Sequence, residues 1–326
     1  MREAAFIKSN REKWLRIESE TDYKEIPADT LADNYIELTD DLSYARTFYP
    51  KSQTVKYLNF LTGRYFIDLY RYRKHEKGRF WKFWKTELPL IMYKYRKHML
   101  YSFLALVIGI LVGAFSQSQD PSFANLILGP GYVNMTLENI EKDDPMAVYK
   151  SMNEAPMFFF ISTNNIKVAF IAFIFGIFLS AGTYFIIFSN GVMLGTFQYF
   201  FFERDLFWTS ASSIWLHGTL EISAIIIAGG AGIAMGNSIL FPGSYKRITS
   251  LQRAASDAVK IVVGLIPVFV VAAFIESFWT RLTDAPLSFN ISIIGISAIF
   301  IFWYFFYYPY ILNKKINGIS TKNQPA

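Results

Sequence analysis

His217 and Glu221 stand four residues apart in the apolar stretch 215–236, WLHGTLEISAIIIAGGAGIAMG. Residues at i and i+4 share one face of an α-helix, so both groups would point the same way. An ionised side chain at the centre of a bilayer costs about 3 kcal/mol or more, and such residues mark functional sites by default. The pair could bind a metal, carry a proton or belong to a buried polar network.

A metal site would need a third protein ligand. The chain has no cysteine, and its other histidines, His75 and His98, precede the first long apolar segment. Glu276 is the best candidate to complete a ligand set with His217 and Glu221. The sequence alone favours the polar network, because buried charges persist only when they are paired and hydrogen-bonded. We therefore predict no catalytic residue, no resident metal and no cofactor.

Three asparagines near the ends of apolar segments are candidate members of the same polar cluster. Asn164 and Asn165 precede an apolar run, and Asn164 is predicted to cap the helix that follows. Asn190 stands before Gly191, and Asn-Gly is a strong turn signal. Because carriers also build sites from ionisable residues near helix breaks, a transport pathway for a small solute or a proton remains the alternative.

Glycines cluster in the same part of the chain, where they would give helices a smooth face for close packing. The predicted helix-packing glycines are Gly191, Gly195, Gly218, Gly229, Gly230 and Gly232.

The bulk composition indicates a polytopic membrane protein. Of 326 residues 52% are hydrophobic and 18% aromatic, with a mean hydropathy of +0.24, which is too apolar for an ordinary soluble domain. No cleavable signal peptide is visible, since the first long apolar run begins near Met99. We expect the preceding residues to stay in the cytoplasm and the protein to lie in the cell (inner) membrane.

The first 98 residues divide into two predicted segments. Residues 1–78 form a helical domain, in which helices over 31–49 and 51–72 make a hairpin at Pro50. That hairpin either buries its own apolar face as a self-contained helical domain or serves as a docking platform for a partner. Residues 79–98 interleave Trp, Phe and Tyr with Lys and Arg, which predicts an amphipathic helix at the membrane interface and argues against a nucleic-acid partner. Residues 51–98 carry 13 basic and 3 acidic residues, as expected of a cytoplasmic flank.

The transmembrane bundle is predicted over 99–312, followed by a basic tail, 313–326. Residues 117–165 form a long exterior loop with six acidic and two basic residues. The predicted all-helical bundle has about six spans, at residues 99–116, 166–188, 191–202, 212–235, 259–278 and 290–308.

The third of these segments, 191–202, is short for a span and decides the topology. If it crosses the membrane, the loop 236–258 and the tail both face the cytoplasm and obey the positive-inside rule. If it does not, the protein has five spans and both basic segments face outward. We prefer six spans.

An ordered set of motifs resembles the stage II sporulation protein M family. The motifs are NNIKVA from Asn164, NGVMLG from Asn190, HGTLE from His217, IAGGAG from Ile227, PG at Pro242, ESF from Glu276 and YLNFL from Tyr57. The resemblance extends over nearly the whole chain. Leu216 stands before His217, where the family often has proline.

The resemblance implies an integral membrane protein without enzyme activity of its own. In spore-formers such a protein acts with cell-wall hydrolases during septal remodelling, and full-length relatives accompany an AAA-type ATPase. We therefore expect a non-enzymatic scaffold or accessory subunit with envelope partners in the lipid bilayer. A transporter or permease-like subunit is the alternative function. The sequence does not decide whether the protein forms a homo-oligomer.

Overall fold

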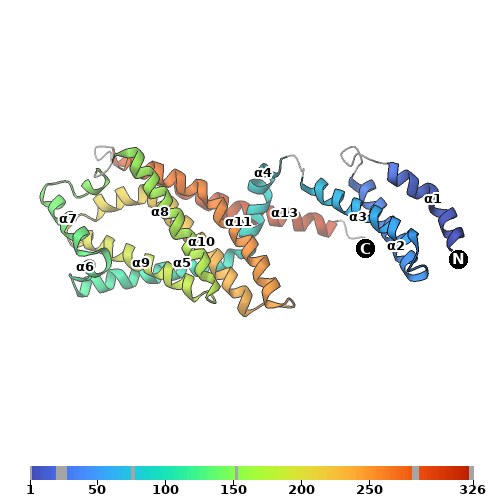
Figure 1. Cartoon of the computed structure of the whole chain (residues 1–326). Coiled ribbons are helices and arrows are strands. Elements are labelled where there is room, and N and C mark those ends of the chain that lie inside the picture. The colour runs from blue at the N-terminus through green and yellow to red at the C-terminus, as the bar shows by residue number, and fades with distance from the viewer. Residues whose placement is uncertain (1, 20–27, 75–77, 151–152, 281–285, 323–326) are drawn as a thin grey trace. The chain divides into compact units, whose positions relative to one another are not determined.

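The computed structural model describes residues 2–19, 28–74, 78–150, 153–280 and 286–322 (Figure 1). All regular structure in these ranges is helical, and six helices are long and apolar enough to cross a membrane. The prediction of an all-helical polytopic membrane protein is therefore confirmed. The chain forms two compact units, residues 1–81 and 82–326. His75 lies outside the described residues.

The first unit is a bundle of three helices with its own hydrophobic core. Its helices are α1 (Glu3–Ser19), α2 (Ala28–Phe48) and α3 (Gln53–Lys74). The predicted hairpin is formed by α2 and α3, and α1 completes the core with Phe6, Trp14 and Ile17. Trp14 Nε1 donates to Asp41 at 2.8 Å, and the Tyr65 hydroxyl donates to the Ile17 carbonyl at 2.9 Å. The apolar face of the hairpin is therefore buried within the unit, against α1.

The second unit contains all six candidate spans. Its elements in chain order are α4 (Arg79–Lys82, at the boundary), η1 (Phe83–Glu87), α5 (Leu88–Gln119), α6 (Phe123–Leu128), α7 (Pro130–Glu141), η2 (Ala147–Lys150), α8 (Glu154–Ile174), η3 (Phe175–Ile177), α9 (Ala181–Phe202), α10 (Phe207–Leu240), α11 (Arg247–Phe274), η4 (Ile275–Trp279), α12 (Leu287–Phe302), η5 (Trp303–Tyr307) and α13 (Tyr308–Lys322).

The turn between the second and third spans lies ten residues earlier than predicted. The chain turns at Leu179 and Ser180, both with positive φ, and α9 then runs unbroken through Asn190. The prediction of a break at Asn190-Gly191 is wrong, because Asn190 Nδ2 donates within its own helix to the Ile186 carbonyl at 2.8 Å. The third span is thus a full 22-residue helix, which favours six spans over five.

Two further boundaries differ from the sequence prediction. Helix α8 begins at Glu154, so Asn164 lies in its middle and does not cap it. Residues 79–119 form one continuous helical segment, in place of an interfacial helix followed by a separate span. Two ion pairs join its first half to α11, Lys94 to Asp257 at 2.7 Å and Glu87 to Lys260.

The segment expected as a long loop is largely helical. Helices α5 and α8 leave only residues 120–153 between them, and α6 and α7 occupy most of that length. Apolar side chains of this cap, such as Ala124, Val133 and Met146, pack on Phe200 and Phe201 at the end of α9. The cap therefore covers one end of the bundle.

Close packing of α5 on α9 depends on two pairs of glycines. Gly109 and Gly113 of α5 meet Gly191 and Gly195 of α9, each pair with the spacing G-x-x-x-G. A Cβ atom at any of the four would overlap a backbone carbonyl oxygen of the other helix. Small residues at this spacing let membrane helices approach closely, and here they let α9 pack as the third span.

The two ends of the bundle differ in charge. Residues 120–153 hold most of the acidic groups at one end, and the basic residues of α5, of the 241–247 turn and of α13 lie at the other. Contacts at the basic end join these segments, since Asn237 pairs with His98 at 3.1 Å and the Tyr308 hydroxyl donates to the Lys85 carbonyl at 2.7 Å.

This charge difference yields a topology prediction in a chain that has no cysteine. Cysteines introduced for exposed Asn134 at the acidic end and exposed Ser244 at the basic end should react differently with an impermeant thiol reagent. We expect Asn134→Cys to be labelled in intact cells and Ser244→Cys only after permeabilisation, because basic flanks stay in the cytoplasm. Labelling of both in intact cells would restore five spans, and the reverse pattern would invert the orientation.

A second prediction concerns the independence of the two units. Deletion of residues 1–75 should leave a folded, monodisperse bundle in detergent, because each unit closes its own core. Size-exclusion chromatography and thermal melting of the truncated and full-length proteins provide the test. Aggregation of the truncated protein alone would show that the first unit is needed to complete the bundle.

Candidate functional site

Helix α10 places His217 and Glu221 on one face in the interior of the bundle. It packs against α5, α8, α9, α11 and α12, and it is the most enclosed of the six spans. His217 is only 5% exposed, and Glu221 is partly buried one turn further along. Both side chains therefore lie on one face of α10, as their i, i+4 spacing predicts.

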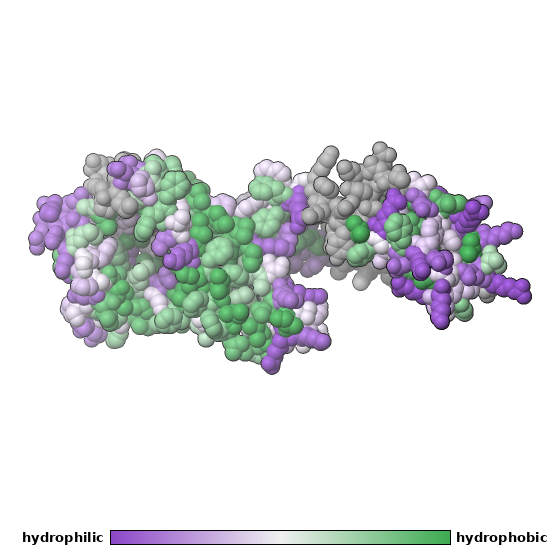
Figure 2. All heavy atoms as spheres, in the orientation of Figure 1, coloured by the Kyte–Doolittle hydropathy of each residue, from purple (hydrophilic) through white to green (hydrophobic). Residues whose placement is uncertain are grey.

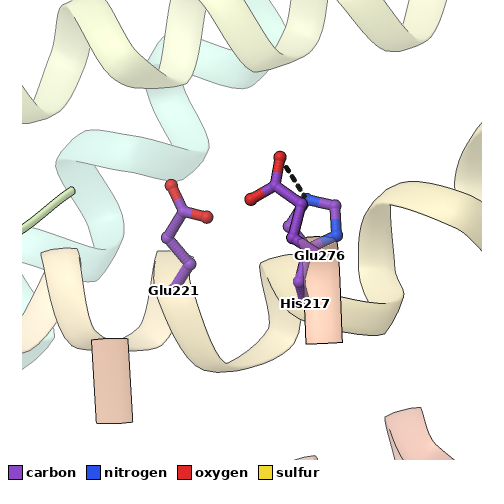
Figure 3. A group of neighbouring side chains, drawn as sticks. All are labelled: His217, Glu221 and Glu276. Atoms are coloured by element: carbon purple, nitrogen blue, oxygen red, sulfur yellow. Dashed lines mark ion pairs between the residues drawn. The ribbon is translucent and has the colours of Figure 1, made fainter. Parts of the chain in front are cut away.

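Glu276 reaches the pair from the π-helix η4 at the end of α11. The wider turn is closed by a hydrogen bond from the Thr280 amide to the Ile275 carbonyl at 3.0 Å. Single π-helical turns are rare in proteins, and many of those that occur lie at functional sites. Glu276 Oε1 lies 3.8 Å from His217 Nε2, and the ligand-type atoms of His217, Glu221 and Glu276 all lie within 4.8 Å of one another (Figure 3).

The residue that orients the imidazole is Thr280. Its Oγ1 lies 3.3 Å from His217 Nδ1 and is placed to donate to the Ile275 carbonyl at 3.4 Å. When the hydroxyl donates to that carbonyl, Oγ1 is free to accept a hydrogen bond from Nδ1–H. In that tautomer the second ring nitrogen, Nε2, carries a lone pair on the side of Glu276.

The structure separates the three asparagines that the sequence grouped with this cluster. Asn165 is buried, and its side chain lies beside Glu221. Asn164 is exposed on the outer face of α8 and does not reach the cluster. Asn190 lines the same cavity as Glu221, but its Nδ2 donates to its own helix.

A cavity of about 380 Å³ adjoins the cluster. Its walls are mostly apolar side chains of α5, α6, α9 and α10, and its polar lining is provided by Asn190, His217, Glu221, Tyr132 and Tyr149. An apolar pocket with a few convergent polar groups is the usual form of a small-ligand site.

Tyr149 is a site residue that sequence reasoning missed. It comes from η2 in the exterior cap, and its ring meets the His217 ring edge-on with centroids 5.9 Å apart. Desolvation in this apolar corner raises the pKa of the Tyr149 hydroxyl well above its ordinary value, and the Glu276 carboxylate adds to the rise. Tyr149 therefore remains a protonated donor at neutral pH. A lone tyrosine in an irregular segment carries no periodic signal that could have identified it.

Glycines on α10 let neighbouring helices approach the site. A Cβ at Gly229 would overlap Ser102 and Ile187, one at Gly230 would overlap Met99, and one at Gly232 would overlap Thr183 and the Ala172 carbonyl. Gly218 differs from these, because a Cβ there would meet only side chains of its own helix at ordinary contact distance. Gly218 lines the cavity and makes no close helix contact.

Comparison with known proteins gives two matches to family models. The family described as Stage II sporulation protein M matches residues 102–281, and the family described as Domain of unknown function (DUF8413) matches residues 4–71. The first range contains the cluster, four of the six candidate spans in whole and the second part of the span Arg79–Gln119. No curated protein and no solved structure matches the chain.

A double-mutant cycle tests whether His217 and Glu276 form one unit. His217→Ala and Glu276→Gln should each lower the melting temperature in detergent, because each leaves a buried polar partner unsatisfied at a cost of about 1–3 kcal/mol. The double variant should lose less than the sum of the two, with a coupling of roughly 0.5–3 kcal/mol. His98→Ala, a distant change on α5, should combine additively with Glu276→Gln. Additivity within the His217–Glu276 pair would show that the two side chains do not interact.

Proposed function

Because the chain belongs to the stage II sporulation protein M family, we propose that it is a non-enzymatic scaffold or accessory subunit of an envelope or cell-wall remodelling complex. Its partners would be cell-wall hydrolases or an AAA-type ATPase system, as the family resemblance implies. The observation that carries this proposal is a lysine on the outer surface of the bundle that forms no ion pair within the described part of the chain.

Lys167 lies on an exposed face of α8 together with Thr163 and Asn164. Figure 2 shows hydrophilic atoms interrupting the hydrophobic surface over the middle of α8. Lys167 is 13 residues from Glu154 and 10 residues from Ile177, the two ends of this span. At 1.5 Å per residue these separations are about 20 Å and about 15 Å, so its Cα lies near the middle of the candidate span.

An isolated lysine at this depth is unfavourable by about 3 kcal/mol, even on the scales that give the smallest penalty. No Asp or Glu in the described part of the chain forms an ion pair with Lys167. A transmembrane helix that carries a carboxylate at the same depth would remove this cost. Two copies of this chain packed symmetrically through α8 would oppose lysine to lysine, so the charge favours a different protein as the partner.

The distribution of charge supports a location in the cell membrane with the N-terminus in the cytoplasm. In that orientation the basic segments face the cytoplasm, as positive-inside bias requires. The exterior cap would meet cell-wall partners, and the first unit would meet an ATPase on the cytoplasmic side. The proposal thus gives each unit a separate class of partner.

A transporter or permease-like subunit is the second candidate, and the cavity beside His217 and Glu221 is the observation that favours it. Buried ionisable groups at a cavity are a feature of substrate and proton pathways. Proton or solute flux in reconstituted vesicles that is lost in Glu221→Gln would favour this candidate over the scaffold.

Photo-crosslinking in native membranes tests the α8 surface directly. A photoreactive residue at Asn164 should give a discrete adduct with another protein, whereas one at Ile299, an exposed position on α12, should not. The adduct should persist in Lys167→Arg and be lost in Lys167→Leu, because only the cation recognises the carboxylate. Mass spectrometry should place the crosslinked peptide in an apolar segment that contains Asp or Glu.

Three results would contradict the proposed docking surface. They are equal crosslinking at Asn164 and Ile299, an adduct unaffected by Lys167→Leu, and an adduct made only of two copies of this chain. The last would indicate a homo-oligomer through α8.

A further inference from the structure

We infer that His217, Glu221 and Glu276 form a binding site for a divalent transition-metal ion, with an open coordination position toward the adjoining cavity. From the sequence alone we predicted no resident metal, because Glu276 was only a candidate for the third ligand. This inference concerns the interior of the bundle and does not depend on the docking surface of α8.

The first support is the ligand set. One imidazole nitrogen and two carboxylate oxygens suit zinc, manganese, iron or cobalt, and three protein ligands with one open position are typical of a reactive metal site. With bonds of about 2.1 Å, tetrahedral ligand atoms lie about 3.4 Å apart. The observed separation of 3.8 Å between His217 Nε2 and Glu276 Oε1, and the 4.8 Å limit for the whole set, need only small side-chain rotations to reach it.

The second support is the hydrogen bonding behind the ligands. Metal-binding histidines donate their other ring N–H to a fixed acceptor, and ligating carboxylates are themselves hydrogen-bonded. Thr280 Oγ1 lies 3.3 Å from His217 Nδ1, within hydrogen-bond distance, and the buried Asn165 side chain lies beside Glu221. His217 Nε2 faces Glu276 Oε1 at 3.8 Å, which is too long for a hydrogen bond, and a cation between the two atoms would contact both (Figure 3).

The third support is charge. Two carboxyl groups this close repel each other when both are ionised. Within the described ranges no Lys or Arg forms an ion pair with Glu221 or Glu276, and the surrounding core is apolar. A divalent cation would balance both carboxylates at once and would also link α10 to α11.

Cobalt binding to the purified full-length protein tests the site. The protein should carry a tag without histidine, and it should be stripped with a chelator before titration with Co²⁺ alone. We expect one Co²⁺ per chain, visible absorption bands of a four- or five-coordinate ion, and displacement by Zn²⁺. Melting temperature should rise with added metal, because the ion binds the folded state.

Three variants and one control assign the ligands. His217→Ala, Glu221→Gln and Glu276→Gln should each weaken Co²⁺ binding by roughly 100-fold or more, since loss of a ligand exceeds the 10- to 100-fold effect of losing its hydrogen-bond partner. His98→Ala removes a partly buried histidine elsewhere in the bundle and should leave binding unchanged. Folded wild-type protein without stoichiometric Co²⁺, or equal binding by wild type and His217→Ala, would overturn the inference. If a ligand variant does not fold, the Co²⁺ stoichiometry and the absorption spectrum of the wild type decide whether the metal site exists.

Discussion

A histidine and two carboxylic acids in the interior of an apolar bundle must satisfy one another, because the hydrocarbon around the bundle offers no hydrogen-bond partner. His217 and Glu221 come from α10, Glu276 and Thr280 from the end of α11, and Asn165 from α8. Their contacts join three spans at one level. The π-helical turn is what brings Glu276 and Thr280 to the same imidazole, so a local irregularity in α11 serves the central interaction.

Glycine packing makes this arrangement sterically available. Gly229, Gly230 and Gly232 remove side-chain bulk from α10, and the glycine pairs of α5 and α9 bring those helices into backbone contact. The enclosed α10 can then hold polar groups away from lipid while the exterior cap covers them with Tyr149. Lys167 presents the opposite case, since it is charged and exposed near the middle of the candidate span Glu154–Ile177.

Periodicity and composition predicted the helical class, the six spans and the presence of His217 and Glu221 on one helix face. They failed where a local signal was outweighed by tertiary packing. Asn190-Gly191 is a turn signal in isolation, but in this bundle Gly191 is needed for contact with α5 and the helix continues. The π-helical turn and the approach of Tyr149 depend on contacts between distant segments, and no short-range pattern in the sequence encodes either.

The protonation pattern of His217 is the most direct test of the account. In a His75→Gln, His98→Gln background His217 is the only histidine outside any tag, so solid-state NMR of ¹⁵N-histidine-labelled protein in lipid reports on that ring alone. We predict that, without added metal, the ring is neutral with its proton on Nδ1, donated to Thr280. The Nε2 resonance should shift when Zn²⁺ is added. A ring with its proton on Nε2, or a doubly protonated ring that ignores Zn²⁺, would contradict this prediction.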